Sequence, residues 1–139
     1  LYTKDAKIGD AAQFVSFIQA DYSVIDNLSF DLGWRNVNNL YADYSIVDSD
    51  FTSPDNQGAL KLPSYNLIDL GTTYRFNLFG NNTYARLNIN NLFNEEYIME
   101  SNTNIHSDGT NPTYQGIDVR NSVWFGFGTT WNFTLKMNF

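Results

Sequence analysis

The clearest pattern in the sequence is the alternation of apolar and polar residues toward the C-terminus. The odd-numbered positions are mostly bulky and apolar: Val123, Phe125, Phe127, Thr129, Trp131, Phe133, Leu135, Met137 and Phe139. The even-numbered positions between them are mostly small or polar. A period of two predicts a β-strand, which we place at 120–135. This strand is longer than the ~5–6 residues usual in soluble sheets, whereas a membrane-spanning strand needs about 9–11 residues.

Four earlier segments alternate in the same way and predict strands near 12–24, 28–44, 64–78 and 82–93. Turn-forming residues separate these segments, so we expect an all-β chain folded as an antiparallel meander of about five strands. The charged residues of the strands all fall in the less apolar row of their own segment: Asp21, Asp31, Arg35, Asp69, Arg75 and Arg86. We expect them on one face of the sheet, opposite a row that includes Phe30, Leu70, Leu87 and Phe127.

The connections between the expected strands alternate in length. Asp26-Asn27 and segment 79–82 are short and carry residues that suit tight hairpins, whereas 36–63 and 94–119 are long and polar. A soluble sandwich and a membrane barrel both give one apolar and one polar face, but this alternation of loop length is typical of outer-membrane barrels. We therefore expect transmembrane strands with apolar side chains toward lipid and polar side chains toward the lumen.

This orientation predicts a location for each end of the sheet. The short turns and the C-terminus are expected on the periplasmic side of a bacterial outer membrane. Loops 45–61 and 94–119 are expected on the extracellular side.

Five strands are too few to close a barrel, because the smallest bacterial membrane barrels have about eight. Open sheet edges in lipid would leave backbone groups unpaired at high cost. The remaining strands must come either from a longer chain or from several copies of this one. Position 1 is Leu rather than Met, so we expect residues 1–139 to be the C-terminal part of a single, incomplete barrel domain.

Composition narrows the classes of function. The net charge of −7 argues against a nucleic-acid partner, and the absence of cysteine excludes disulfides and thiolate metal sites. Aromatic residues make up 17% of the chain and asparagine occurs 19 times, which suits a β-protein rich in turns. No apolar run approaches the ~18 residues of a membrane-spanning helix.

The sequence offers few candidates for catalytic or metal-binding residues. His106 is the single histidine, and the sequence has no nucleophile-elbow or phosphate-binding motif, so we expect a protein that is not an enzyme and needs no cofactor. Asp48, Asp50 and Asp55 supply oxygen ligands of the kind calcium prefers. Their spacing lacks the EF-hand pattern, and an ordinary acidic turn is the alternative.

Three segments in the second half of the chain carry a family resemblance. They are Leu62-Pro63-Ser64-Tyr65 followed by Asp69, Gly71 and Tyr74; Asn90-Asn91-Leu92-Phe93-Asn94 with Tyr97; and Arg120 with the aromatic strand 126–133 and Phe139. Together they resemble late strands and the final strand of TonB-dependent outer-membrane receptors. The resemblance covers 62–139, and the amino-acid sequence of 128–133 is similar to that of receptors from Bacteroidota.

The resemblance implies a barrel of about 22 strands around an N-terminal plug, with TonB pulling on the plug to admit a bound nutrient. The expected function is therefore TonB-dependent uptake of a siderophore, vitamin, glycan or peptide. The implied partners are outer-membrane lipid, the rest of the barrel, the plug and TonB. A surface lipoprotein is a further candidate partner. This chain contains neither plug nor TonB box. The alternative is a non-transporting or oligomer-assembled outer-membrane barrel with a structural or adhesive role.

Two sets of residues are expected to carry the function. The resemblance assigns the signal for barrel insertion to the last strand, at Gly128, Trp131, Phe133 and Phe139. Ligand contacts are expected from the extracellular loops, where binding residues concentrate on rigid scaffolds. Our candidates there are His106, Tyr114 and Asn104.

Overall fold

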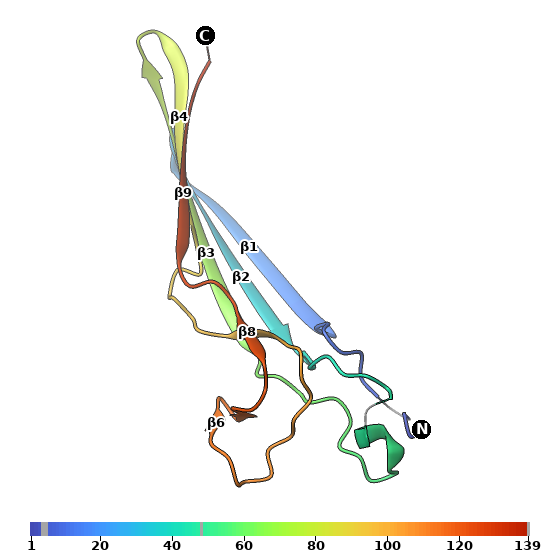
Figure 1. The fold of residues 1–139 in the computed structure, drawn as a ribbon. Helices are drawn as coiled ribbons and strands as arrows, with labels where there is room; N and C mark the ends of the chain where they lie inside the picture. Colours follow the sequence, from blue (N-terminus) through green and yellow to red (C-terminus); the bar gives the residue numbers. More distant parts are fainter. Residues whose placement is uncertain (4–5, 48, 139) are drawn as a thin grey trace. The chain divides into compact units, whose positions relative to one another are not determined.

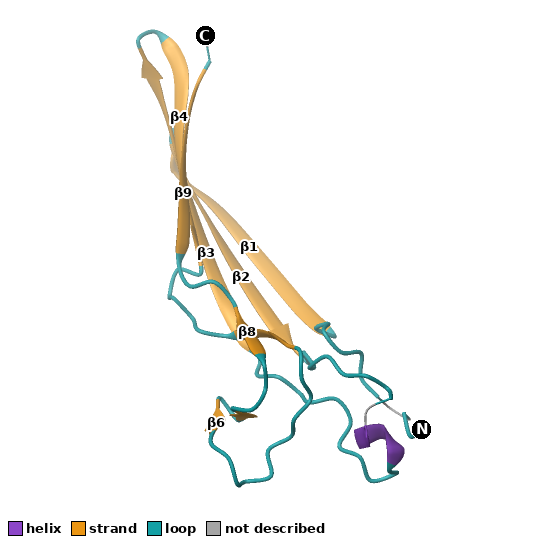
Figure 2. Cartoon of the chain, viewed as in Figure 1, coloured by secondary structure: helices purple, strands orange, loops and turns teal. Residues whose placement is uncertain are grey.

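The structure is a computed structural model that describes residues 1–3, 6–47 and 49–138, with the side chains of residues 49 and 50 also left undescribed. These residues form an all-β fold with one short 3-10 helix, η1 (Ser49–Thr52) (Figure 2). The strands in chain order are β1 (Phe14–Ile25), β2 (Leu28–Asn38), β3 (Tyr65–Leu78), β4 (Asn81–Asn90), β5 (Ile98–Ser101), β6 (Thr113–Tyr114), β7 (Ile117–Asp118), β8 (Val123–Phe125) and β9 (Thr130–Met137) (Figure 1).

Five strands form one sheet in the order β1-β2-β3-β4-β9. β4 pairs antiparallel with both β3 and β9. The predicted all-β meander of five strands is therefore confirmed, although β2 ends at Asn38 rather than near 44. Asn39 follows with a left-handed backbone (φ 52°), which takes the chain out of strand geometry.

The prediction of one strand over 120–135 is wrong. β8 pairs with β5, and β9 begins only at Thr130. The glycines between them explain the break, because a Cβ at Gly126 would collide with the ring of Tyr97, and one at Gly128 would lie 2.6 Å from Asn94 Oδ1. The period of two continues through these residues in the sequence, so alternation alone could not reveal the break.

The register of β3, β4 and β9 sorts their side chains onto two faces, because cross-strand partners point to the same side. One face carries the rows Leu70–Ile89–Trp131 and Thr72–Leu87–Phe133. The other carries the rows Gly71–Asn88–Asn132, Thr73–Arg86–Thr134 and Arg75–Tyr84–Lys136. We call these the apolar face and the polar face.

Ion pairs place the charges of β2 on the same polar face. Arg86 Nη1 lies 2.8 Å from Asp31 Oδ1, and Arg35 Nη2 lies 3.7 Å from Asp69 Oδ2. Asp21 accepts a hydrogen bond from Gln19, its neighbour on the same side of β1 (3.3 Å). The predicted common face of the six charged residues is thus confirmed, with Phe30, Leu70 and Leu87 opposite. Phe127 is the exception, because it lies outside the strands.

Two glycines make room on the polar face for larger side chains. A Cβ at Gly33 would lie 3.2 Å from the ring of Phe17, and a Cβ at Gly71 would collide with the carboxylate of Asp31. Phe17 therefore packs on the polar face even though it is aromatic.

The hairpin between β3 and β4 has the predicted short turn. Leu78 pairs with Asn81, so the loop is only Phe79-Gly80, and both residues have positive φ (51° and 84°). Positive φ at both positions is typical of a type I′ turn, whose twist matches that of the flanking strands.

The chain divides into two compact units. The loop unit comprises Leu1–Val15, Val37–Tyr65 and Glu96–Gly126, and the sheet unit comprises Ser16–Asn36, Asn66–Glu95 and Phe127–Phe139. The loop unit has a hydrophobic core, formed by Leu40, Ala42, Leu60, Leu62, Ile98 and Ile117. The long polar connections are therefore not simply irregular, because they fold around these side chains.

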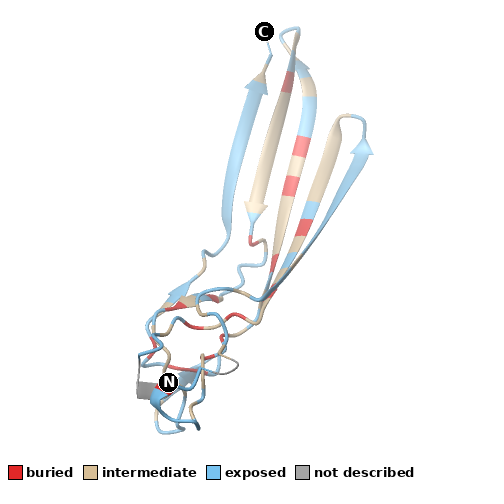
Figure 3. Cartoon of the chain, turned by 90° about the vertical axis from the view of Figure 1, so that its right-hand side faces the viewer, coloured by how far each residue is buried: buried red, intermediate tan, exposed pale blue. Residues whose placement is uncertain are grey.

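The sheet unit is a single layer without such a core. Of its described apolar side chains only Leu67 is buried, and most of its strand residues are intermediate or exposed (Figure 3). Among the described residues, no helix reaches the length and hydrophobicity that a membrane-spanning helix requires.

Candidate functional site

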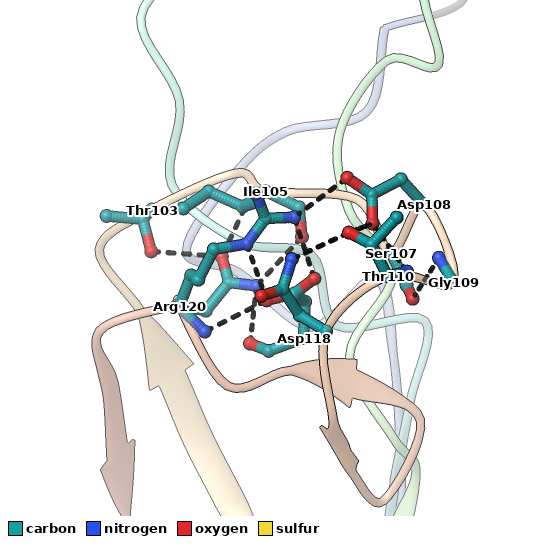
Figure 4. A network of polar contacts seen from close by, with 10 residues as sticks. Thr103, Ile105, Ser107, Asp108, Gly109, Thr110, Asp118 and Arg120 are labelled. Atoms are coloured by element: carbon teal, nitrogen blue, oxygen red, sulfur yellow. Dashed lines mark hydrogen bonds and ion pairs between the residues drawn. The ribbon is translucent and has the colours of Figure 1, made fainter.

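Arg120 is held in the loop unit by two aspartates (Figure 4). Its Nε donates to Asp118 Oδ1 (2.9 Å) and its Nη2 to Asp118 Oδ2 (2.8 Å), while Nη2 also lies 3.4 Å from Asp108 Oδ2. Asp118 is only 1% exposed and stands in β7, which forms a two-residue ladder with β6. The paired contact with Asp118 fixes the plane of the guanidinium group.

Hydrogen bonds keep all three groups of this cluster charged. The side-chain bond from Arg120 lowers the pKa of Asp118, and the same bond raises the pKa of Arg120. Hydrogen bonds from the hydroxyl and backbone N–H of Thr110 lower the pKa of Asp108 from 3.8 to about 2. The cluster therefore has a net charge of −1 at neutral pH.

Asn121 connects this cluster to the neighbouring segment 103–105. Its Oδ1 accepts hydrogen bonds from Thr103 Oγ1 (3.0 Å) and Ile105 N (2.9 Å). Its Nδ2 donates to the carbonyl oxygens of Ile105 (2.8 Å) and Asp118 (3.0 Å). All polar atoms of this buried amide are thus used to hold two stretches of chain in place.

Asn104 and His106 form hydrogen bonds with segment 58–60 of the first long loop. Asn104 Nδ2 donates to Gly58 O (2.9 Å) and its Oδ1 accepts from Leu60 N (2.6 Å). His106 Nε2 lies 3.0 Å from the same Gly58 oxygen. Because a carbonyl only accepts, Nε2 carries the proton in this contact and Nδ1 is left for other partners.

These contacts border a cleft of about 540 Å³ within the loop unit. Its walls come from residues of segments 53–58 and 104–108 together with Arg120. The cleft therefore joins the two loops in which ligand contacts were expected. Its volume falls in the range of about 300–1,000 Å³ typical of small-molecule sites.

Of the three residues predicted to contact a ligand, two line the cleft and one does not. Asn104 and His106 line the cleft, although much of their hydrogen bonding serves the chain itself. Tyr114 is not among the lining residues, because its hydroxyl donates to Glu96 and its ring packs edge-on against Phe125. Whether any of them binds a ligand stays a prediction.

The calcium prediction falls largely outside the described residues. Asp48 and the side chain of Asp50 are not described, and Asp55 is an exposed residue of the cleft wall. Within the described part of the chain, no three acidic or histidine side chains group closely enough to hold a metal ion.

Sequence reasoning missed Asp108, Asp118 and Asn121 as residues of the site. The available signal was Asp118-x-Arg120, because opposite charges two positions apart in extended chain lie on one side. Asn121 carried no signal, since its contacts with Thr103 and Ile105 depend on the fold of the whole loop.

The Asn-rich segment 90–94 forms a separate polar network in the sheet unit. Asn91, only 4% exposed, donates from Nδ2 to Glu95 O (2.9 Å) and Phe127 O (3.1 Å), and accepts at Oδ1 from Glu95 N (2.8 Å). Its own N–H donates to Asp69 Oδ1 (2.9 Å). Thr129 N donates to Asn94 Oδ1 (3.0 Å). This motif therefore fastens the end of β4 to β3 and to the start of β9.

The residues expected to form the insertion signal lie in and before β9. Trp131 and Phe133 are 70% and 58% exposed on the apolar face. Gly128 precedes the strand against Asn94, and Phe139 lies outside the described residues.

Comparison with models of protein families, with curated proteins and with solved structures gives no match for this chain.

Proposed function

We propose that the chain is the C-terminal part of an outer-membrane transport receptor of the TonB-dependent type. In this proposal its five-stranded sheet belongs to a barrel of about 22 strands, and the loop unit is part of the receptor's extracellular surface. The support comes from the sheet's exposed apolar face and from the resemblance of three sequence segments to these receptors.

The observation that carries the proposal is the uncovered apolar face of the sheet unit. Ile18 of β1 and Leu135 of β9 are 62% and 54% exposed, as are Trp131 and Phe133 to a similar degree. In a water-soluble domain such a face is covered by a second layer. The loop unit, by contrast, packs Leu40, Leu60, Leu62 and Ile98 together in a core of its own.

Strand length also supports a membrane location. β1, β2, β3 and β4 have 12, 11, 14 and 10 residues, and a tilted strand crosses a bilayer with about 9–11. The polar face carries ion pairs and amides that suit a wet lumen. Trp131, Phe133 and Tyr74 would then meet lipid or its interface.

The sheet is not closed, and β1 and β9 are its edge strands within the described chain. In lipid both edges need further strands, because unpaired backbone groups are too costly there. We propose that the rest of the receptor's barrel supplies them. The turns at 26–27 and 79–80 would lie on the periplasmic side, with loops 45–61 and 94–119 outside the cell.

A matched pair of substitutions in β9 tests the membrane location. In the intact protein, Phe133→Arg places a charge on the apolar face, whereas Asn132→Arg places the same charge on the polar face. Arg facing mid-bilayer lipid costs about 2–4 kcal/mol, so we expect Phe133→Arg to reduce the heat-modifiable protein in outer-membrane fractions. Asn132→Arg should insert normally, and equal insertion of both variants would contradict the proposal.

The transport half of the proposal is tested in cells that lack TonB. Growth that depends on this receptor should stop in those cells, although the receptor remains in the outer membrane. Growth that continues without TonB would favour a non-transporting barrel.

A further inference from the structure

We propose that the cleft between segments 53–58 and 104–108 binds a neutral saccharide. This inference rests on the proposed function, because it names the class of nutrient that the extracellular loops would take.

The walls are fixed before any ligand arrives. Asn56 Nδ2 donates to Ser53 O (2.7 Å) and to Tyr2 O (3.1 Å), and its Oδ1 accepts from Gly58 N (3.0 Å). Asn104 and His106 then bind Gly58 from the opposite loop. A site that is already ordered loses less conformational entropy on binding.

Three groups on these walls have hydrogen-bonding capacity to spare. The carboxylate of Asp55 and the amide of Gln57 make no hydrogen bond to another described residue, and both side chains are exposed. Arg120 uses Nε and Nη2 on its aspartates, while its Nη1 has no partner among the described residues. The cleft thus offers an acceptor, an amide that both donates and accepts, and a donor.

The charge of the cleft argues against anionic ligands. Arg120 is already matched by Asp118 and Asp108, and Asp55 adds a further carboxylate. These four groups together carry a formal charge of −2, so a carboxylate, phosphate or catecholate ligand would meet net repulsion.

The lining also disfavours apolar and cationic ligands. Among the described residues of the lining, Ile105 is the one with an aliphatic side chain, which gives little surface for a flat hydrophobic ligand. A cation could pair with Asp55 but could not accept a hydrogen bond from Nη1 of Arg120. A hydroxyl group both donates and accepts, so the hydroxyls of a sugar suit the acceptor, the amide and the donor that line the cleft.

The test uses the intact receptor in lipid nanodiscs. An array of neutral oligosaccharides is the probe, with acidic oligosaccharides and spermidine presented alongside, and calorimetry then gives the affinity for the best neutral glycan. We expect binding of a neutral glycan, weakened about tenfold or more by Asp55→Ala and by Gln57→Ala, as expected for a lost hydrogen bond of about 1.4 kcal/mol. Both residues are exposed, so these variants should fold.

Asp26→Asn, an exposed change in the β1–β2 turn, is the matched control and should bind as the parent does. Absence of binding to every neutral glycan overturns the inference, as does binding that Asp55→Ala and Gln57→Ala leave unchanged. Preference for the acidic glycans or for spermidine also overturns it. The heat-modifiable band of the same preparations shows whether the barrel has inserted, so failure of the saccharide inference is distinguishable from failure of the proposed function.

Discussion

The side chain of Asn91 joins the end of β4 to the chain just before β9. Asn91 takes a left-handed backbone (φ 50°), which asparagine tolerates better than most residues, and its amide bonds two separate stretches of chain. Asn91→Ala removes three hydrogen bonds, so we expect a loss of about 2–4 kcal/mol.

The measurement is the temperature at which the protein in lipid loses its heat-modifiable form. Asn91→Gly keeps the positive φ but removes the same bonds, and it should lose nearly as much. If the glycine variant melted like the parent protein, the backbone rather than the amide would be the important feature.

The stability of the loop unit should depend on pH because of Asp108. Its pKa is lowered from 3.8 to about 2 by hydrogen bonds from Thr110, so the folded state favours the charged form. The stabilisation is therefore present above pH ~4 and is lost as the pH falls through about 2. We expect pepsin to cleave segment 103–111 faster as the pH is lowered from 4 to 2.

Asp108→Asn should be cleaved readily at pH 4 already, with a weaker pH dependence. Asp55→Asn is the matched control, because the Asp55 carboxylate makes no hydrogen bond to another described residue, and it should follow the parent. An unchanged profile for Asp108→Asn would show that this carboxylate does not stabilise the loop.

At the scale of elements, β9 is the strand on which assembly is expected to depend. It forms one edge of the sheet and carries the aromatic residues that resemble an insertion signal. Deleting 131–139 removes both the edge and the signal, so we expect the receptor to fail insertion and to be degraded in the periplasm.

The double variant Trp131→Ala, Phe133→Ala keeps the strand and removes only the aromatic rings, which separates the two causes. Immunoblots of outer-membrane fractions, with and without heating, measure the outcome. Normal amounts of heat-modifiable protein after the deletion would show that the end of the chain is dispensable.

At the scale of the whole molecule, the two units differ in how they bury apolar side chains. The loop unit has its own core, whereas the sheet unit leaves its apolar face exposed. A lipid-soluble photoactivatable probe should therefore label Trp131, Phe133 and Leu135 in membranes. It should spare Asn132 and Lys136 on the polar face, and the loop unit as well. Equal labelling of both faces, detected by mass spectrometry of peptides, would argue against a lipid-facing sheet.

The sequence by itself determined the elements and faces of the sheet. Alternation with a period of two located β1, β3 and β4 closely, because each strand has one apolar and one polar side. The same alternation placed Asp31, Asp69 and Arg86 on one face, and the structure pairs Asp31 with Arg86. The turn at Phe79-Gly80 was equally local, since its glycine signals the backbone that a tight hairpin needs.

Only the tertiary structure decided where the last strand breaks and how the loops fold. The break depends on Tyr97 and Asn94, which lie some thirty residues before the glycines they press against. The cleft depends on Asn104 and His106, which contact Gly58 although they lie 46 and 48 residues after it in the sequence. Local periodicity does not predict such contacts, because they arise from packing between segments that no sequence pattern connects.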